Sequence, residues 1–337
     1  MTENKRELKR MISIYGIYKK IPGGSLLVPM FLIAIINTIF PNLLASFGGM
    51  TTAMFKTGTM AFAAAILFFT GAGIKAKTLG TVIKRCGILT LMKLAIAFGF
   101  GFLFVRLFGT DGFLGITTVA FVTCICSCNP GVFMGLAADY GEAGDMGNFA
   151  TMNIVSMPCW PMLILAAAAG AKFNVMDLVT VFVPFLLGML LGNLDPGFAK
   201  IVGPANAALI PLMGCCFGST LNLVTAVKAG GAGLLLALLY LVLNVPFMLF
   251  ADRVLARRPG YAAVSWCSIA GIAMTVPAMA ESLEAFAPTI ATASAQIGLA
   301  MIVTCIVSPF LTKWVVNKWG SPKVPAKKDR LPAETAK

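Results

Sequence analysis

Long apolar stretches separated by short polar or basic connections make up almost the whole chain. A bilayer core of about 30 Å is spanned by roughly twenty residues of α-helix. On this measure we identify ten stretches, at 25–44, 57–74, 86–105, 113–138, 149–171, 177–194, 205–223, 232–250, 262–280 and 289–312. The pattern therefore predicts an all-α integral membrane protein with about ten transmembrane helices.

Composition and charge favour the same class. Hydrophobic residues make up 58% of the chain and charged residues only 12%, whereas a soluble domain carries roughly a quarter charged residues. The net charge of +13 raises the question of nucleic-acid binding. The basic residues, however, lie in short clusters between apolar stretches and form no platform with aromatic residues. We therefore expect the lipid bilayer, and no nucleic acid, as a partner.

The distribution of Lys and Arg predicts the orientation. With ten spans the two termini and the even-numbered connections share one side, which carries twenty-one Lys and Arg residues. The other side carries four, and Lys93 lies within the third span. Because basic residues are retained on the cytoplasmic side, both termini are expected to be cytoplasmic.

A proline pattern shared by the first and sixth spans indicates an internal repeat. Pro29 and Pro41 are twelve residues apart, as are Pro184 and Pro196. Gly-Ala-Gly-Ile-Lys at 71–75 corresponds in the same way to Gly-Ser-Thr-Leu-Asn at 218–222. Five spans is an odd number, so the two copies must be inverted in the membrane, as in many secondary transporters. The alternative is a chance coincidence of two short patterns in apolar sequence.

The repeat divides the chain into four segments. A basic cytoplasmic segment at 1–24 precedes the first five-helix repeat at 25–171. The second, inverted five-helix repeat is expected at 172–316, followed by a basic, disordered cytoplasmic tail at 317–337.

The fourth and ninth spans contain interruptions that predict a binding site. Pro130, in the run Cys-Ser-Cys-Asn-Pro-Gly at 126–131, removes a helical hydrogen bond, and the ninth span has polar residues and Pro277 within 265–277. Backbone freed at mid-depth must face protein or a water-filled cavity. The N–H ends of half-helices bind anions, while free carbonyls coordinate cations or hydroxyls.

Polar side chains beside these interruptions are the candidate ligands for a hydroxyl-bearing substrate. They are Ser127, Asn129, Ser268 and Thr275, and as second choices Asn153 and Ser156 of the fifth span. Glu281, one turn after Pro277, is the candidate for binding the coupling ion. The alternative for each Ser, Thr or Asn is a hydrogen bond between neighbouring helices.

The remaining polar groups in the spans suggest structural roles. Lys93 is about two turns into its span, so we expect its side chain to extend to the cytoplasmic face. The nine cysteines lie nearly all in apolar stretches and predict no disulfide framework. Cys124, Cys126 and Cys128 leave a metalloid permease as an alternative, but on a continuous helix Cys126 points away from the other two. No metal site, cofactor or catalytic residue is expected.

The chain resembles the 2-keto-3-deoxygluconate permease family, part of the wider bile-acid/arsenite/riboflavin transporter group. The resemblance extends from residue 21 to about 314 and rests on Ile-Pro-Gly-Gly at 21–24, Gly-Ala-Gly-Ile-Lys at 71–75, Gly-Asn-Leu-Asp-Pro at 192–196, Thr-Val-Pro at 275–277 and Ala-Glu at 280–281. It implies ten helices whose broken fourth and ninth members cross. It also implies a symporter of the cell inner membrane that imports a keto-deoxy sugar acid with protons.

Two departures from the family bear on the coupling ion. Members often carry an acidic residue shortly before the Asn of the fourth-span interruption and another in the fifth span, where this chain has Cys126 and Val155. The leading hypothesis is therefore a secondary active importer of 2-keto-3-deoxygluconate or a related sugar-acid anion, coupled to a proton or to sodium. Alternatives are a sodium-coupled carrier of another small organic anion, a metalloid or soft-oxyanion permease using Cys126 and Cys128, and a membrane receptor or scaffold that transports nothing.

Overall fold

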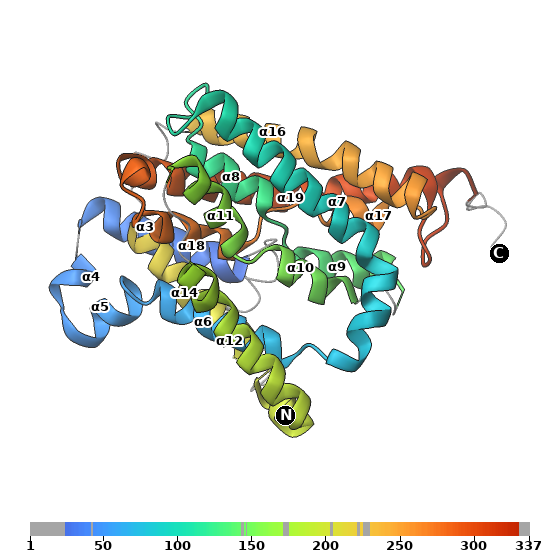
Figure 1. Cartoon of the computed structure of the whole chain (residues 1–337), viewed down its shortest axis with the longest axis horizontal. Helices are drawn as coiled ribbons and strands as arrows, with labels where there is room; N and C mark the ends of the chain where they lie inside the picture. Colours follow the sequence, from blue (N-terminus) through green and yellow to red (C-terminus); the bar gives the residue numbers. More distant parts are fainter. Residues whose placement is uncertain are drawn as a thin grey trace, which may run out of the picture.

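The computed structural model describes residues 24–41, 43–142, 145, 147–170, 175–202, 205–220, 223–224 and 230–329. Within them the regular structure is helical (Figure 1), apart from an isolated bridge between Phe113 and Ile116. The predicted all-α class is confirmed for this part of the chain. Almost all of the basic N-terminal segment lies outside the described residues, and so do the last residues of the basic tail.

The apolar stretches fold into helices of very different lengths. In chain order the α-helices are α3 (Gly24–Ile39), α4 (Leu43–Ser46), α5 (Gly49–Phe55), α6 (Thr59–Ala72), α7 (Ala76–Phe108), α8 (Thr118–Cys126), α9 (Pro130–Tyr140), α10 (Asn148–Val155), α11 (Cys159–Ala168), α12 (Val175–Leu194), α13 (Pro196–Val202), α14 (Ala205–Thr220), α16 (Gly230–Phe250), α17 (Tyr261–Ser265), α18 (Thr275–Ala280) and α19 (Ile290–Trp319). A π-helical turn, η2 (Ala251–Leu255), and three 3-10 turns, η3 (Gly271–Met274), η4 (Glu284–Thr289) and η5 (Lys327–Asp329), complete the list.

Several of these helices are long and apolar enough to cross a membrane. Among the described residues five qualify: Cys86–Phe108, Thr118–Ala137, Asn148–Ala168, Gly230–Leu255 and Glu284–Trp319. A sixth is possible if α5 and α6, which are bent by 56° at their junction, form one span. Shorter apolar helices at Val28–Ile39, Val179–Leu194, Ala208–Ser219 and Gly271–Ala280 overlap the other predicted spans. The structure thus supports a multi-pass membrane protein, and ten crossings stay a prediction.

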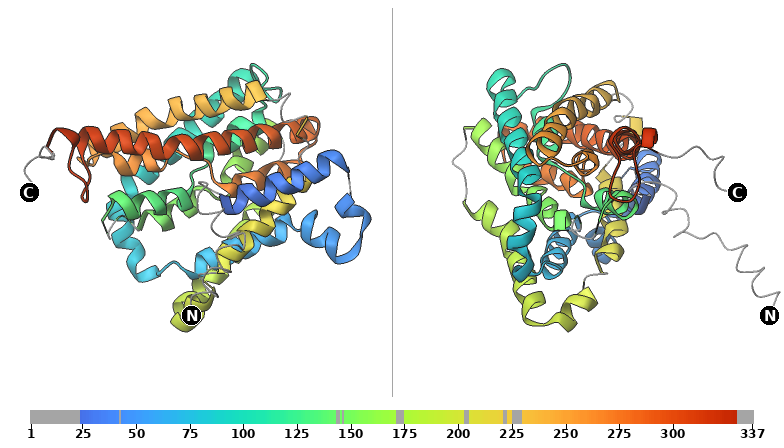
Figure 2. Two further views of the ribbon diagram at one scale, coloured as in Figure 1. Left: turned by 180° about the vertical axis from the view of Figure 1, so that it is seen from behind. Right: turned by 90° about the vertical axis from the view of Figure 1, so that its right-hand side faces the viewer.

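The helices pack into two groups in space, and the members of the two groups alternate along the chain. In the smaller group α3 packs along α14 and α6 packs along α12. The larger group contains α7 to α11 and α16 to α19, with α19 packed lengthwise against α16 (Figure 2). Each group therefore combines helices from both predicted repeats.

Glycines allow the helices of the smaller group to approach closely. A methyl group on Gly188 of α12 would overlap the carbonyl oxygen of Phe68 in α6, and one on Gly71 would overlap that of Phe185. Gly218 of α14 faces the carbonyl of Met30 in α3 in the same way. Small residues at such crossings let backbones pack directly, which is how helices associate in lipid.

Side chains from one helix also complete the ends of its neighbours. Asn193 of α12 donates from Nδ2 to the carbonyl of Ile74 at 2.8 Å and accepts from the N–H of Ala76 at 2.9 Å, so it spans the α6–α7 connection. The N–H of Leu223, just after α14, donates to Thr38 Oγ1 of α3 at 2.9 Å. Backbone groups left free where these helices end are thereby satisfied.

The interruptions predicted in the fourth and ninth spans are both present. Between α8 and α9, residues 127–129 leave the helical conformation, and Ser127 and Asn129 are extended. Residues 266–270 similarly separate α17 from η3 and α18. Both interruptions lie in the larger group, where α8 and α9 pack against α18 and α17 respectively.

Candidate functional site

The two interruptions meet and are joined by hydrogen bonds. The N–H of Ala270 donates to Ser127 Oγ at 2.9 Å, and Asn129 Nδ2 donates to the carbonyl of Ile269 at 3.1 Å. On the far side the N–H of Ile269 donates to Thr304 Oγ1 of α19 at 3.1 Å. Non-helical backbone inside a membrane protein needs such partners, because lipid offers none.

Asn129 also explains why α9 begins where it does. Its Oδ1 accepts from the N–H groups of Gly131 and Val132, at 3.0 and 3.2 Å, which makes it the N-cap. Pro130 takes the first helical position, where its missing N–H costs nothing. The local sequence Asn-Pro-Gly therefore ends one half-helix and starts another at a defined residue.

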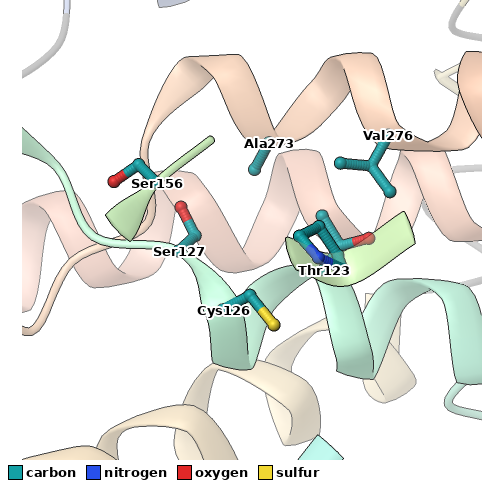
Figure 3. A pocket seen from close by; sticks show the side chains of 7 residues that line it. Thr123, Cys126, Ser127, Ser156, Ala273 and Val276 are labelled. Atoms are coloured by element: carbon teal, nitrogen blue, oxygen red, sulfur yellow. The ribbon is translucent and has the colours of Figure 1, made fainter. Parts of the chain in front are cut away.

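A narrow hollow lies beside this contact (Figure 3). Ser127 and Ser156 lie towards one side of the view in Figure 3, with Thr123 and Val276 towards the other. The lining residues come from α8 and the residue after it, the α10–α11 junction, α11, η3 and α18: Thr123, Cys126, Ser127, Ser156, Pro161, Ala273 and Val276. The hollow thus carries three hydroxyl groups and one thiol on an otherwise apolar wall.

Thr123 is a lining residue that the sequence prediction missed. Its Oγ1 is buried and has no hydrogen-bond partner among the described residues. A buried hydroxyl without a partner costs free energy unless something else bonds to it. The sequence carried a signal for Thr123, because it is four residues before Ser127 and residues four apart lie on the same face of a helix.

Ser156 holds the first interruption from the fifth predicted span. Its hydroxyl donates to the carbonyl of Cys128 at 2.6 Å and lies 3.3 Å from the N–H of the same residue. It lies where the fifth span is itself interrupted, because α10 ends at Val155 and α11 begins at Cys159. Ser127 and Ser156 are thus the two predicted ligands that the structure brings together at the hollow.

The other predicted ligands lie away from the hollow lining. Asn153 donates to the carbonyl of Phe149 in its own helix at 2.7 Å, and Thr275 donates to the carbonyl of Ile272 at 2.7 Å. Ser268 is fully buried, and its hydroxyl has no partner among the described residues. Glu281 is exposed at the end of α18. Their roles in binding stay predictions.

The prediction that Lys93 reaches the cytoplasmic face is wrong. Its side chain is 1% exposed, and Nζ donates to the carbonyl of Ile125 at 3.0 Å and to Asn244 Oδ1 at 2.5 Å. The same amine lies 4.8 Å from the ring centre of Tyr240, whose hydroxyl donates to the carbonyl of Ser127 at 3.0 Å. The prediction failed because it considered only the distance to the interface, whereas the interruption of α8 leaves carbonyls that bind an ammonium group inside the protein.

The cysteines of the fourth span do not form a metal site in the described residues. No three side chains among His, Cys, Asp and Glu are arranged there to hold an ion. Cys128 Sγ instead lies 3.1 Å from Ser156 Oγ, while Cys126 lines the hollow. The thiols therefore pack against neighbouring helices, as small buried side chains do.

Comparison with known proteins relates the chain to transporters. Residues 15–321 match the family described as 2-keto-3-deoxygluconate permease. The chain is 35% identical over 301 residues to 2-keto-3-deoxygluconate permease 1 of Salmonella typhimurium, covering 89% of this chain and 94% of that protein. It is 34% identical over 316 residues to the 2-keto-3-deoxygluconate permease of an Enterobacter species, covering 92% and 95%. The corresponding permease of Escherichia coli O157:H7 is 33% identical over 312 residues, covering 91% and 93%.

Proposed function

Because the chain belongs to the 2-keto-3-deoxygluconate permease family, we propose that it imports 2-keto-3-deoxygluconate or a related sugar-acid anion across the cell inner membrane by proton symport. Family membership makes it a multi-pass membrane transporter and not an enzyme. The observation that carries the proposal is the pair of interrupted helices joined at Ser127 and Asn129 beside a polar hollow. Paired half-helices of this kind form substrate sites in secondary transporters.

The hollow supports a substrate that carries several hydroxyl groups. Thr123 offers a hydroxyl that has no partner among the described residues, and Ser127 and Ser156 contribute two more at the same wall. A site built to bond hydroxyls discriminates strongly against analogues that lack them, because its own polar groups would be left unpaired. We propose that these three residues contact the substrate, with Asn129, Asn153, Ser268 and Thr275 as further candidates.

The proposed architecture is ten helices in two inverted repeats, 25–171 and 172–316. Contacts that recur at corresponding positions of the two repeats support this architecture. Gly71 faces the carbonyl after Pro184, and its predicted equivalent Gly218 faces the carbonyl after Pro29. A contact between the second and sixth spans thus has a counterpart between the seventh and the first.

Hydrogen bonds at the helix ends follow the same correspondence. The acceptors Asn193 and Thr38 are each nine residues after the repeated proline. Their donors, the N–H groups of Ala76 and Leu223, are each five residues after the repeated glycine. A chance similarity of two proline patterns would not give matched long-range bonds, so this agreement favours a true repeat.

The orientation follows from the charge pattern. We propose that both termini are cytoplasmic, since most Lys and Arg residues lie on the side of the termini in a ten-span arrangement. The hollow then lies between the cytoplasmic and outer ends of the interrupted spans. Alternating access would expose it first to one side and then to the other.

Uptake into proteoliposomes tests the function. Purified protein is reconstituted, and accumulation of radiolabelled 2-keto-3-deoxygluconate is measured under an imposed pH gradient and, separately, a sodium gradient. Accumulation under the pH gradient is the expected result. Accumulation under the sodium gradient alone would identify sodium, in place of the proton, as the coupling ion. No uptake under either gradient would overturn the proposal and favour another organic anion, a metalloid or a non-transporting role.

A further inference from the structure

Lys93 carries a buried amine at the junction of three predicted spans. It lies in α7, and its amine bonds to the carbonyl of Ile125 in α8 and to Asn244 in α16. Ile125 is in the last turn of α8, where the interruption removes the N–H donors that a continuous helix would supply. Lys93 therefore reaches the backbone next to Cys126 and Ser127, two of the residues that line the hollow.

In the part of the chain that the structure describes, this amine has no anionic partner. Within the described residues no carboxylate forms an ion pair with it, and the titratable groups that face it are Tyr240, Cys124, Cys126, Cys128 and Cys267. An isolated charge inside a protein is costly unless it is paired. A carboxylate bound in the adjacent hollow would supply the missing negative charge.

A purely structural reading assigns Lys93 to the end of α8. Cations at helix C-termini are favourable, and one bonded carbonyl fits that reading. It does not explain why a lysine, which can lose its proton, is fully buried at the interruption whose residues line the polar hollow. Burial next to the hollow makes the protonation of Lys93 depend on whether an anion is bound.

We propose that Lys93 carries the coupling proton, an inference that rests on the proposed transport of a sugar-acid anion. When the substrate carboxylate enters from outside, the neutral amine takes one proton from water and becomes an ammonium. When the substrate leaves on the cytoplasmic side, the ammonium loses its counterion and releases that proton. One proton and one anion move together, and no net charge crosses the membrane.

Replacing Lys93 with an arginine separates charge from protonation. Arginine keeps the positive charge but does not release its proton in proteins. With one proton per substrate, a gradient of about one pH unit drives roughly tenfold accumulation. Lys93→Arg is expected to exchange internal for external substrate. Its internal substrate concentration should rise only to the external concentration, a ratio of about one, because the arginine does not release its proton. Lys200→Arg, the same change on an exposed lysine, should accumulate like the wild type.

A second variant tests the inference without altering Lys93. Asn244→Asp places a carboxylate against the amine, so Lys93 should stay charged whether or not substrate is bound. Accumulation under the pH gradient is again expected to fall to about onefold, with exchange retained. The Asn244→Asp variant is informative even if Lys93→Arg does not fold. Size-exclusion elution and thermal unfolding in detergent show whether each of the two variants is folded.

The outcomes are distinguishable. If the wild type takes up no sugar acid, the proposed function fails before Lys93 is in question. If the wild type accumulates and the folded variants Lys93→Arg and Asn244→Asp do so equally well, the proton is carried elsewhere and the inference is overturned. Loss of accumulation in Glu281→Gln, with Lys93→Arg still coupled, would also overturn it and assign the proton to Glu281.

Discussion

At the residue scale, Asn129 has the most varied set of bonds in the first interruption. Its carbonyl oxygen caps α9, and its amide nitrogen holds the backbone of the second interruption at Ile269. The same amide nitrogen lies 3.5 Å from Cys305 Sγ in α19. One side chain therefore determines where a helix starts and how two interrupted spans are joined.

Truncation of Asn129 should separate these two roles. Asn129→Ala loses the cap, worth about 1 kcal/mol, and leaves the Ile269 carbonyl with one partner fewer, costing about another 1–3 kcal/mol. Asn129→Ser keeps a capping oxygen but is too short to reach Ile269, so its loss should be intermediate. Thermal unfolding in detergent measures both, with Asn153→Ala, whose bond stays within one helix, as the control. Equal stabilities for the Ala and Ser variants would contradict the capping role, and a Ser variant as stable as the wild type would contradict the bridging role.

The thiols beside the hollow make a second residue-scale prediction. Since no metal-binding group of three is present among the described residues, Cys126→Ser with Cys128→Ser should keep sugar-acid uptake within about twofold, or ~0.5 kcal/mol. Serine can also preserve the contact with Ser156. Uptake of labelled substrate into proteoliposomes is the measurement. Loss of arsenite uptake with no sugar-acid uptake in the parent protein would instead favour the metalloid alternative.

At the element scale, the smaller helix group depends on backbone contact. The α6–α12 crossing has Gly71 on one helix and Gly188 and Gly192 on the other, each facing a carbonyl of its partner. Sequence patterns predicted both helices but not their pairing, because the repeat motif fixes which positions are equivalent and says nothing of which helices touch. The interruption at Asn129-Pro130, in contrast, was predictable because its cause is local.

A methyl group at Gly188 should force α6 and α12 apart. The added carbon would overlap the Phe68 carbonyl, which is backbone and cannot move aside, so Gly188→Ala should cost about 1–3 kcal/mol or more. Gly99→Ala, within α7, meets no neighbouring atom and should be neutral or stabilising by up to about 1 kcal/mol. Thermal unfolding of the two variants makes the comparison. If the repeat is real, Gly71→Ala and Gly218→Ala should lose similar amounts of stability.

At the scale of the whole molecule, the sequence predicted which segments are apolar and where two of them break. It did not predict that Lys93 would bond at the interruption, because that bond depends on contacts between helices. Among the described residues, four of the predicted spans contain only the shorter apolar helical segments Val28–Ile39, Val179–Leu194, Ala208–Ser219 and Gly271–Ala280. The predicted length of the first span, for example, includes residues 40 and 41, which follow the end of α3.

The membrane topology is the prediction that joins charge, repeat and fold. With both termini inside, the connection between α7 and α8 faces outward and that between α6 and α7 faces the cytoplasm. Single cysteines are introduced as Asp111→Cys and Lys77→Cys, both at exposed positions, in a Cys215→Ser background. That background removes the only free cysteine among the described residues that is not buried. An impermeant maleimide should label Asp111→Cys in intact cells and Lys77→Cys only after permeabilisation. The reverse pattern would invert the orientation, and labelling of both sites in intact cells would contradict the ten-span arrangement, because an odd number of crossings separates the two connections.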